Sequence, residues 1–277
     1  MDIGTGLALL GSAKLVQKLL GPTAEYIGEG IQAWAERRTN NVRRIIEKAT
    51  RKLGADLDKS GAVPPKVLRG ILSEGSFCDD ELSAEYFGGV LAASRSDVER
   101  DDRGATLIAQ LSRLSTYQIR THYILYSILR KVYKDSGLDM KKDNRHKLHV
   151  FISEPTYLAA MDFNEKEEDL LESIYDDTFF GLVREGLIED FQYGPRDELM
   201  EKYYFTVPDD GVVFKPTNLG SALFLWAHGY SHLTASAILD PDREFEIEQQ
   251  IDIIDGYGEI DGYGRASLYQ AMSSARP

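Results

Sequence analysis

The sequence of 277 residues predicts a mainly α fold, in which an all-α N-terminal helical domain precedes an α+β winged-helix-like domain. Apolar residues recur at helical spacing through the first 133 residues. A helix, two β-prone runs and a further helix follow, in the order typical of a winged-helix unit. The charge also divides the chain, because residues 1–149 carry 24 Lys and Arg against 19 Asp and Glu (net +5), whereas residues 150–277 carry 8 against 26 (net −18).

The composition suits a globular protein, since 43% of the residues are hydrophobic. A single cysteine, Cys78, argues against a disulfide framework and a Cys-based zinc cluster. The uncharged stretch 3–13 is too short to span a bilayer alone, and no basic region of a secretory signal precedes it. We therefore expect a cytoplasmic protein.

Residues 3–20 are expected to form a helix that is apolar on nearly all its faces, and such a helix is buried in protein or lies in lipid. Its glycines would let another helix approach closely. Two interpretations follow: burial in an oligomeric or intramolecular core, and insertion into or association with a membrane. The candidate membrane or oligomerisation residues are Gly4, Leu7, Leu10, Gly11, Lys14 and Val16.

Gly21-Pro22 ends this helix and begins a long amphipathic one, whose apolar stripe runs from Ile27 to Leu53. Its other face is basic and is either solvated or in contact with acidic lipid headgroups, nucleic acid or the acidic second half. The basic residues are Arg37, Arg38, Arg43, Arg44, Lys48, Arg51 and Lys52.

Further helices are expected after Pro64-Pro65, after Asp79-Asp80-Glu81, through Leu107–Leu114, and from Ser115, which begins a capping box. The predicted segments are an apolar helix at 1–21, a helical domain at 22–133, a basic linker at 134–149, a winged-helix-like domain at 150–239, and an acidic Gly/Tyr tail at 240–277 that is solvated or docked on a partner.

Within the winged-helix-like domain we expect a helix over 165–185, strands at 203–207 and 212–215, and a last helix from Asn218. Asp209-Asp210-Gly211 is a hairpin turn signal between the two strands. The expected recognition region is acidic, and such a surface repels the phosphate backbone. We therefore favour a protein–protein or regulatory module over nucleic-acid binding for this unit. The acidic residues are Asp169, Glu172, Asp176 and Asp177.

The sequence carries no recognisable catalytic constellation. It has no phosphate-binding loop and no nucleophile elbow. His228 and His232 share a helix face but lack a third zinc ligand, and the acidic neighbours of Cys78 disfavour a thiolate. We therefore expect a protein that is not an enzyme and has no cofactor and no metal site.

The chain resembles the abortive infection alpha (Abi-alpha) family in the stretches GPTAEYIGEGIQAWAERRTNNVRRIIEKA, VPPKVLRGILSEGSFCDDELSAEYFGGVLAAS and LSRLSTYQ. The resemblance covers roughly residues 20–120 well and the C-terminal half more loosely. It implies a bacterial anti-phage role in which the protein arrests or kills the infected cell. The acidic tail with its repeated Gly-Tyr-Gly is not a feature of the family.

The chain also resembles the membrane effector of Hailong-type defence systems. In those systems a partner nucleotidyltransferase makes short DNA oligomers that hold an oligomeric, channel-forming effector closed. The resemblance implies that the N-terminal helix is the membrane-active element and that a basic cluster holds the oligonucleotide.

The sequence thus leads to a non-enzymatic, homo-oligomeric phage-defence effector that associates with the inner membrane from the bacterial cytoplasm and permeabilises it when triggered. The alternative is a soluble regulatory protein that binds a protein partner through its acidic winged-helix-like half. A nuclease-like effector is a weaker third hypothesis, because metal ligands are missing. The candidate binding residues for single-stranded DNA are Lys141, Lys142, Arg145 and Lys147 in the linker, beside Tyr133, His146 and His149, and Arg43 and Arg44 on the long helix.

Overall fold

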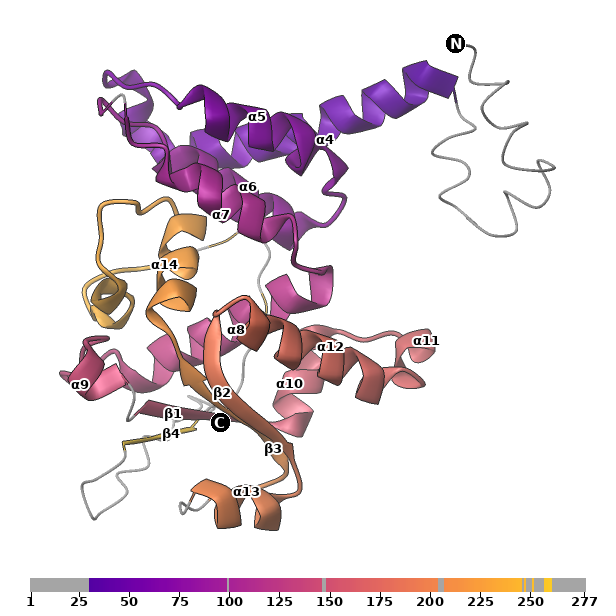
Figure 1. Ribbon diagram of the computed structural model, residues 1–277, viewed down its shortest axis with the longest axis vertical. Helices are drawn as coiled ribbons and strands as arrows, with labels where there is room; N and C mark the ends of the chain where they lie inside the picture. The colour runs from indigo at the N-terminus through magenta and orange to yellow at the C-terminus, as the bar shows by residue number, and fades with distance from the viewer. Residues whose placement is uncertain are drawn as a thin grey trace, which may run out of the picture.

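The computed structural model describes residues 30–98, 100–145, 148–203, 207–245, 247, 251 and 257–260 (Figure 1). The apolar helix predicted at 3–20 lies outside the described residues, and so do its candidates Gly4, Leu7, Leu10, Gly11, Lys14 and Val16. Among the described residues, no helix is both long and apolar enough to cross a membrane.

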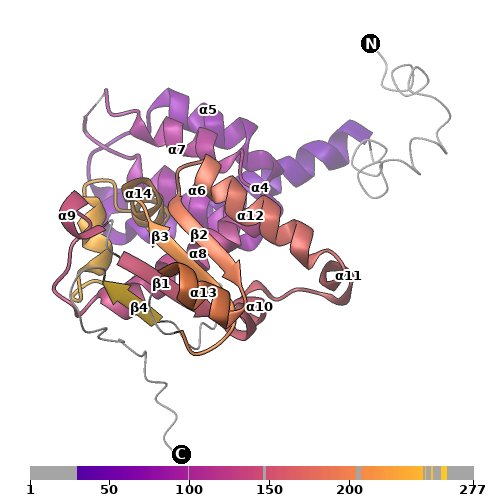
Figure 2. The same cartoon turned by 60° about the horizontal axis from the view of Figure 1, so that its bottom comes forward.

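The first part of the described chain is helical, as the sequence predicts. Its elements are α4 (Gly30–Leu53), the 3-10 turn η1 (Gly54–Asp58), α5 (Pro65–Ser73), η2 (Gly75–Phe77), α6 (Glu81–Ala93), α7 (Arg103–Leu111) and α8 (Thr116–Tyr133). Helix α4 packs along α6, and α5 and α7 lie beside them (Figures 1 and 2).

The predicted helix starts are confirmed by their capping contacts. Pro65 occupies the first turn of α5, and the Asp80 side chain accepts a hydrogen bond from the backbone N–H of Ser83 at the start of α6. The capping box at Ser115 is present, with Gln118 as the reciprocal partner. These contacts satisfy backbone groups that a helix end leaves unpaired.

The C-terminal part combines helices with a small antiparallel sheet, which confirms the predicted fold class. After the short α9 (Lys142–Arg145) come β1 (Leu148–Ser153), α10 (Glu154–Met161), α11 (Glu165–Glu168), α12 (Leu171–Arg184), β2 (Ile188–Gly194), α13 (Arg196–Tyr203), β3 (Gly211–Pro216), α14 (Asn218–Ala227) and η3 (Ala235–Leu239). With α9, α11 and α13 as insertions, the order α8, β1, α10, α12, β2, β3 is that of a winged-helix unit.

The sheet has the strand order β2-β3-β1-β4, in which β4 (Tyr257–Ile260) comes from the tail. Strand β3 pairs with both β1 and β2, and β4 pairs antiparallel with the outer edge of β1. Part of the tail is therefore docked on its own chain through backbone pairing.

Two element boundaries differ from the prediction. The prediction of a strand at 203–207 is wrong for its first residue, because Tyr203 ends helix α13. The strand that pairs with β3 is β2. Leu199 and Tyr203, four residues apart, are buried and pack with Phe151 of the sheet, so tertiary contacts favour the helix. The helix expected over 165–185 is divided at Leu170, whose backbone is not helical.

The segment predicted as a basic linker, 134–149, contains α9 and the first two residues of β1. His149 is buried, and its carbonyl oxygen accepts a 2.6 Å hydrogen bond from the Tyr133 hydroxyl. The notion that Tyr133 and His149 stack with bases is therefore wrong, because both side chains belong to the core.

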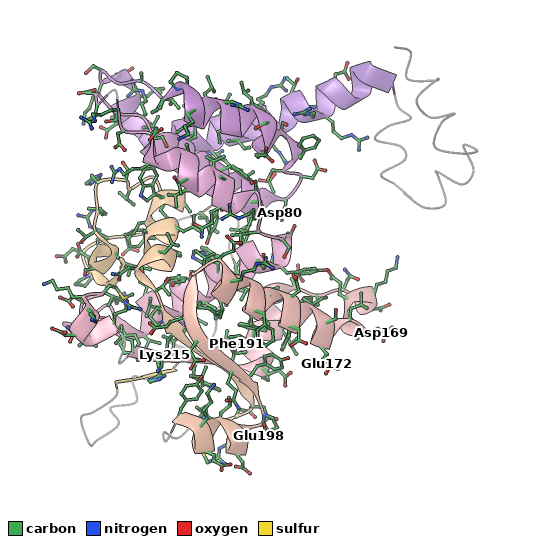
Figure 3. All side chains as sticks on the ribbon, viewed as in Figure 1. Asp80, Asp169, Glu172, Phe191, Glu198 and Lys215 are labelled. Atoms are coloured by element: carbon green, nitrogen blue, oxygen red, sulfur yellow. The ribbon has the colours of Figure 1, made fainter. Side chains whose placement is uncertain are left out.

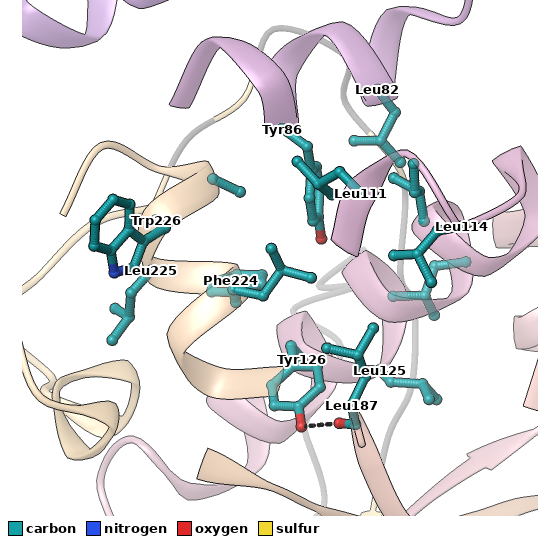
Figure 4. Packing of buried hydrophobic residues seen from close by; sticks show 14 of the residues in the cluster. Leu82, Tyr86, Leu111, Leu114, Leu125, Tyr126, Leu187, Phe224, Leu225 and Trp226 are labelled. Atoms are coloured by element: carbon teal, nitrogen blue, oxygen red, sulfur yellow. Dashed lines mark hydrogen bonds between the residues drawn. The ribbon is translucent and has the colours of Figure 1, made fainter. Parts of the chain in front are cut away.

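One large hydrophobic cluster joins the helical part to the sheet, from Ile45 on α4 to Leu239 on η3. Figure 4 shows α6, α8 and α14 meeting in it, with the Tyr126 hydroxyl donating to the carbonyl oxygen of Leu187 over 2.5 Å. A buried chain of hydrogen bonds also joins these helices. The Tyr86 hydroxyl donates to Nδ1 of His122, whose Nε2–H donates to the carbonyl oxygen of Gly220.

Candidate functional site

The basic face of α4 is largely paired with α6. Lys48 Nζ lies 2.8 Å from a carboxylate oxygen of Glu81 and 2.9 Å from one of Glu85, and Lys52 Nζ lies 2.7 Å from the other oxygen of Glu85. The side chains of Lys48 and Glu85 are only 4% and 2% exposed. Lys48 and Lys52, which were expected to face solvent or a ligand, therefore hold α4 against α6.

Arg44, a predicted DNA-binding residue, is also held within the molecule. Its guanidinium pairs with Glu81 at 2.7 Å and donates to the carbonyl oxygen of Cys78 at 2.8 Å. Arg43 is exposed and donates to the Asn40 side chain at 3.0 Å. Of the two predicted residues on this helix, Arg43 is the one whose position suits an external anion.

The described residues of the linker cluster do not converge on one site. Arg145 pairs with Glu189 at 2.6 Å and donates to the carbonyl oxygen of Pro216. Its guanidinium is therefore held against strands β2 and β3. Lys141 is largely exposed and pairs with Asp139 in its own turn at 3.1 Å. Lys142 is exposed on α9, whereas Lys147 lies outside the described residues, as does His146.

A basic cavity of about 550 Å³ lies where α4 and α6 meet the segment that follows α14. Three cations from the C-terminal half of α4 line it, together with Glu85, His228 and residues of the tail. The lining residues are Lys48, Arg51, Lys52, Glu85, His228, Tyr230, Glu244, Phe245 and Ile247.

His228 is a buried wall residue of this cavity. Its Nδ1–H donates to the carbonyl oxygen of Phe224 at 2.7 Å, which leaves Nε2 as an acceptor. Nε2 is buried and has no hydrogen-bond partner among the described residues. Burial lowers the pKa of His228 to about 4, so the imidazole is neutral at pH 7.

Arg130 of α8 holds the tail against the cavity. Its guanidinium donates to the carbonyl oxygens of Ile238 and Asp240 at 2.8 Å each and to that of Arg243, and it stacks on the Phe245 ring at 4.5 Å. These contacts bring Glu244 of the acidic tail beside the cations of α4. No local sequence pattern predicts this role for Arg130, because the carbonyl acceptors lie 108 to 113 residues away.

An acidic aromatic groove of about 440 Å³ runs between α12 and β2. We define this groove by Asp176, Phe180, Val183, Glu189, Asp190, Phe191, Gln192, Tyr193 and Lys202. Asp169 and Glu172 extend from the neighbouring N-terminal end of α12 (Figure 3). The predicted acidic character of this region is therefore combined with aromatic side chains.

The sequence pattern did not predict the aromatic residues of the groove. Phe180 is 62% exposed and packs edge-on against Phe191 at 5.1 Å, while its neighbour Phe179 is buried. Adjacent helical residues point about 100° apart, so the pair Phe179-Phe180 was the available signal that one ring is exposed. Asp177, by contrast, accepts a hydrogen bond from Gln118 and serves the internal packing of α12.

Among the described residues, no group of three or more His, Cys, Asp or Glu side chains is arranged to hold a metal ion. Burial and the nearby Asp80 raise the pKa of the Cys78 thiol to about 12, so it is protonated at neutral pH. Comparison with protein-family models, with curated proteins and with solved structures gave no match.

Proposed function

We propose that the chain is a homo-oligomeric effector of anti-phage abortive infection that permeabilises the bacterial inner membrane when triggered. The observation that carries this proposal is the placement of α4. Its C-terminal half is held to α6 by Glu81 and Glu85. Its N-terminal end projects away from the other described elements (Figures 1 and 2). A helix of 24 residues is a rod about 36 Å long.

In the sequence, the apolar segment 1–21 precedes this projecting end of α4. The resemblance to Abi-alpha and Hailong-type effectors supports the same division between a folded body and a membrane-active N-terminus. The chemistry proposed for the segment is insertion into lipid, where a nearly uncharged helix with small residues can pack against its copies.

Membrane fractionation of the full chain tests the proposal. Wild-type protein that arrests cell growth is expected in the inner-membrane pellet, and Leu10→Asp is expected to shift it to the soluble fraction, because a charge near the bilayer centre costs a few kcal/mol. Growth arrest by wild-type protein found only in the soluble fraction would contradict membrane action.

The proposal includes a short single-stranded DNA, made by a partner nucleotidyltransferase, as the ligand that holds the effector inactive. Lys141, Lys142 and Arg43 are the candidates whose described positions leave them accessible. Fluorescence anisotropy with a short oligonucleotide should show binding that weakens steeply with salt. Lys141→Ala/Lys142→Ala should weaken it if the linker holds the strand, and Arg43→Ala if α4 does. Absence of binding to the wild type at low salt would remove this ligand.

A second candidate function is favoured by the acidic aromatic groove. In this version the chain is a regulatory protein that binds a protein partner through its winged-helix-like half. An exposed phenylalanine surrounded by carboxylates is an anchor for a complementary protein surface, and it repels nucleic acid. Soluble localisation together with loss of growth arrest in Phe180→Asp would favour this function.

A further inference from the structure

The acidic aromatic groove exposes an apolar side chain beside several carboxylates. Phe180 projects from α12 and packs against Phe191, and Asp176, Glu189 and Asp190 line the groove with them. Glu189 is paired with Arg145 and Asp190 with Lys202, which leaves an excess of negative charge in the groove. Glu172 lies one turn before Asp176 on the same helix and extends the acidic edge. A partner that fits this groove therefore needs an aliphatic or aromatic side chain flanked by cations.

The outer face of α5 has the opposite character. Leu68 and Leu72, four residues apart on one side of the helix, are 42% and 50% exposed, and Arg69 lies exposed between them. Lys66 is exposed one turn before, and it contacts Asp102 at 3.1 Å.

Arg38 extends this face towards Phe77, which is also exposed. Its guanidinium lies over the Phe77 ring at 4.2 Å and reaches the carbonyl oxygens of Leu72 and Ser73. We define the α5 face by Arg38, Lys66, Leu68, Arg69, Leu72 and Phe77.

We propose that the acidic aromatic groove of one copy binds the α5 face of a second copy. The two surfaces are complementary in both properties, because each exposes apolar side chains and their charges are opposite. The division of charge, +5 for residues 1–149 and −18 for residues 150–277, favours an orientation in which the first half of one copy faces the second half of the other.

The two surfaces lie on different parts of the molecule, since α5 belongs to the helical layer and the groove to the winged-helix-like part (Figure 1). One chain therefore leaves both of them open and offers both to its neighbours. Such a contact is head-to-tail and forms a closed ring or an open filament, according to the rotation between copies. This inference rests on the homo-oligomer of the proposed function and assigns its interface.

Light scattering on the full chain tests the interface. We choose the Leu10→Asp background, so that lipid-seeking or helix-mediated association of residues 1–21 does not enter the comparison. This parent is expected to assemble at tens of micromolar and to dissociate as salt is raised, because the contact is partly electrostatic. Adding Phe180→Asp or Leu72→Asp should each reduce the mass to that of a monomer. Leu57→Asp, at an apolar residue of η1 with similar exposure, is the matched control and should leave the assembly unchanged.

A mixture of the Phe180→Asp and Leu72→Asp variants provides the decisive test of the interface. The Phe180→Asp variant keeps its α5 face, and the Leu72→Asp variant keeps its groove, so an equimolar mixture should form a dimer and no larger species. A monomeric mixture, a monomeric Leu10→Asp parent, or variants with the parent's mass would each overturn the interface. Membrane fractionation tests the proposed function separately, because growth arrest without membrane association would contradict that function whatever the masses measured by light scattering.

Discussion

Glu85 on α6 holds α4 in place through two lysines. Its carboxylate receives Lys48 and Lys52, and both Glu85 and Lys48 are almost fully buried. A buried ion pair adds little net stability over an apolar pair, but removal of one partner leaves an uncompensated charge. The pairing therefore acts chiefly by fixing the position of α4 relative to α6.

Glu85→Gln should lower the free energy of unfolding by about 3 to 5 kcal/mol, because it leaves Lys48 and Lys52 without their shared carboxylate. Glu81→Gln is the matched control, since Glu81 is half-exposed and its loss should cost less than about 1 kcal/mol. Urea unfolding followed by circular dichroism measures both. Equal losses for the two variants would contradict the importance of burial.

The sequence indicated the basic face of α4 but not what its cations contact. Arg44 and Glu81 are 37 residues apart, and Arg145 and Glu189 are 44 apart. No local pattern identifies such partners, because they are brought together only when helices and strands pack. The same reason explains why Arg130 was not recognised as the residue that holds the tail.

At the scale of elements, the crossing of α6 and α14 depends on Gly89. A Cβ atom at this position would lie 1.8 Å from the carbonyl oxygen of Ala227, which is backbone and cannot rotate away. The close approach of the two helices lets Phe224 and Tyr86 join the same core. The helix α6 is buried along almost its whole length, which explains its lack of a polar face.

Gly89→Ala should destabilise the fold by at least about 1 to 3 kcal/mol, the usual cost of overpacking, despite the better helix propensity of alanine. Gly70→Ala on α5 is the matched variant, since its Cβ would lie 2.6 Å from Cγ2 of the Ile108 side chain and would not meet backbone. Thermal unfolding should show a clearly lower midpoint for Gly89→Ala than for Gly70→Ala. A higher midpoint for Gly89→Ala would show that the helices separate without cost.

The elements that the sequence predicted well are those with local signals. Asp80, Ser115 and Thr217 cap the starts of their helices and Pro65 stands in the first turn of α5, each where expected. Strand β1 and helix α13 were missed because their side chains are selected by packing against the rest of the sheet. The division of the chain into a helical part and a winged-helix-like part was predictable; the pairing of the tail with β1 was not.

At the scale of the whole molecule, one hydrophobic cluster joins the helical and winged-helix-like parts, so we expect them to unfold together. Two neutral histidines lie within this shared core. Burial lowers the pKa of His122 to about 3 and that of His228 to about 4. Each stays unprotonated in the folded state at pH values where an unfolded histidine takes up a proton.

Stability should therefore be complete above about pH 6.5, the unfolded pKa, and should fall as the pH drops towards the folded values. Each histidine contributes a slope of up to about 1.4 kcal/mol per pH unit. Urea unfolding between pH 7 and pH 5 measures the slope, which His122→Gln/His228→Gln should flatten. His232→Gln, at an exposed residue, should leave it unchanged; an unaltered slope in the double variant would contradict this origin.

In the proposed effector, the folded part of the chain assembles with its copies and the apolar N-terminal segment acts on lipid. In this proposal the groove and the α5 face form the contact between copies, and the basic residues bind an anionic ligand. Permeabilisation of a membrane by the proposed effector depends on residues 1–21.

Membrane depolarisation in cells expressing the full chain tests that claim most directly. A potential-sensitive dye should report depolarisation before growth arrest with the wild type. Leu10→Asp at equal expression, with the same folded-state circular dichroism, should abolish both, because a charge near the bilayer centre costs a few kcal/mol. Full depolarisation and arrest by Leu10→Asp would contradict the account.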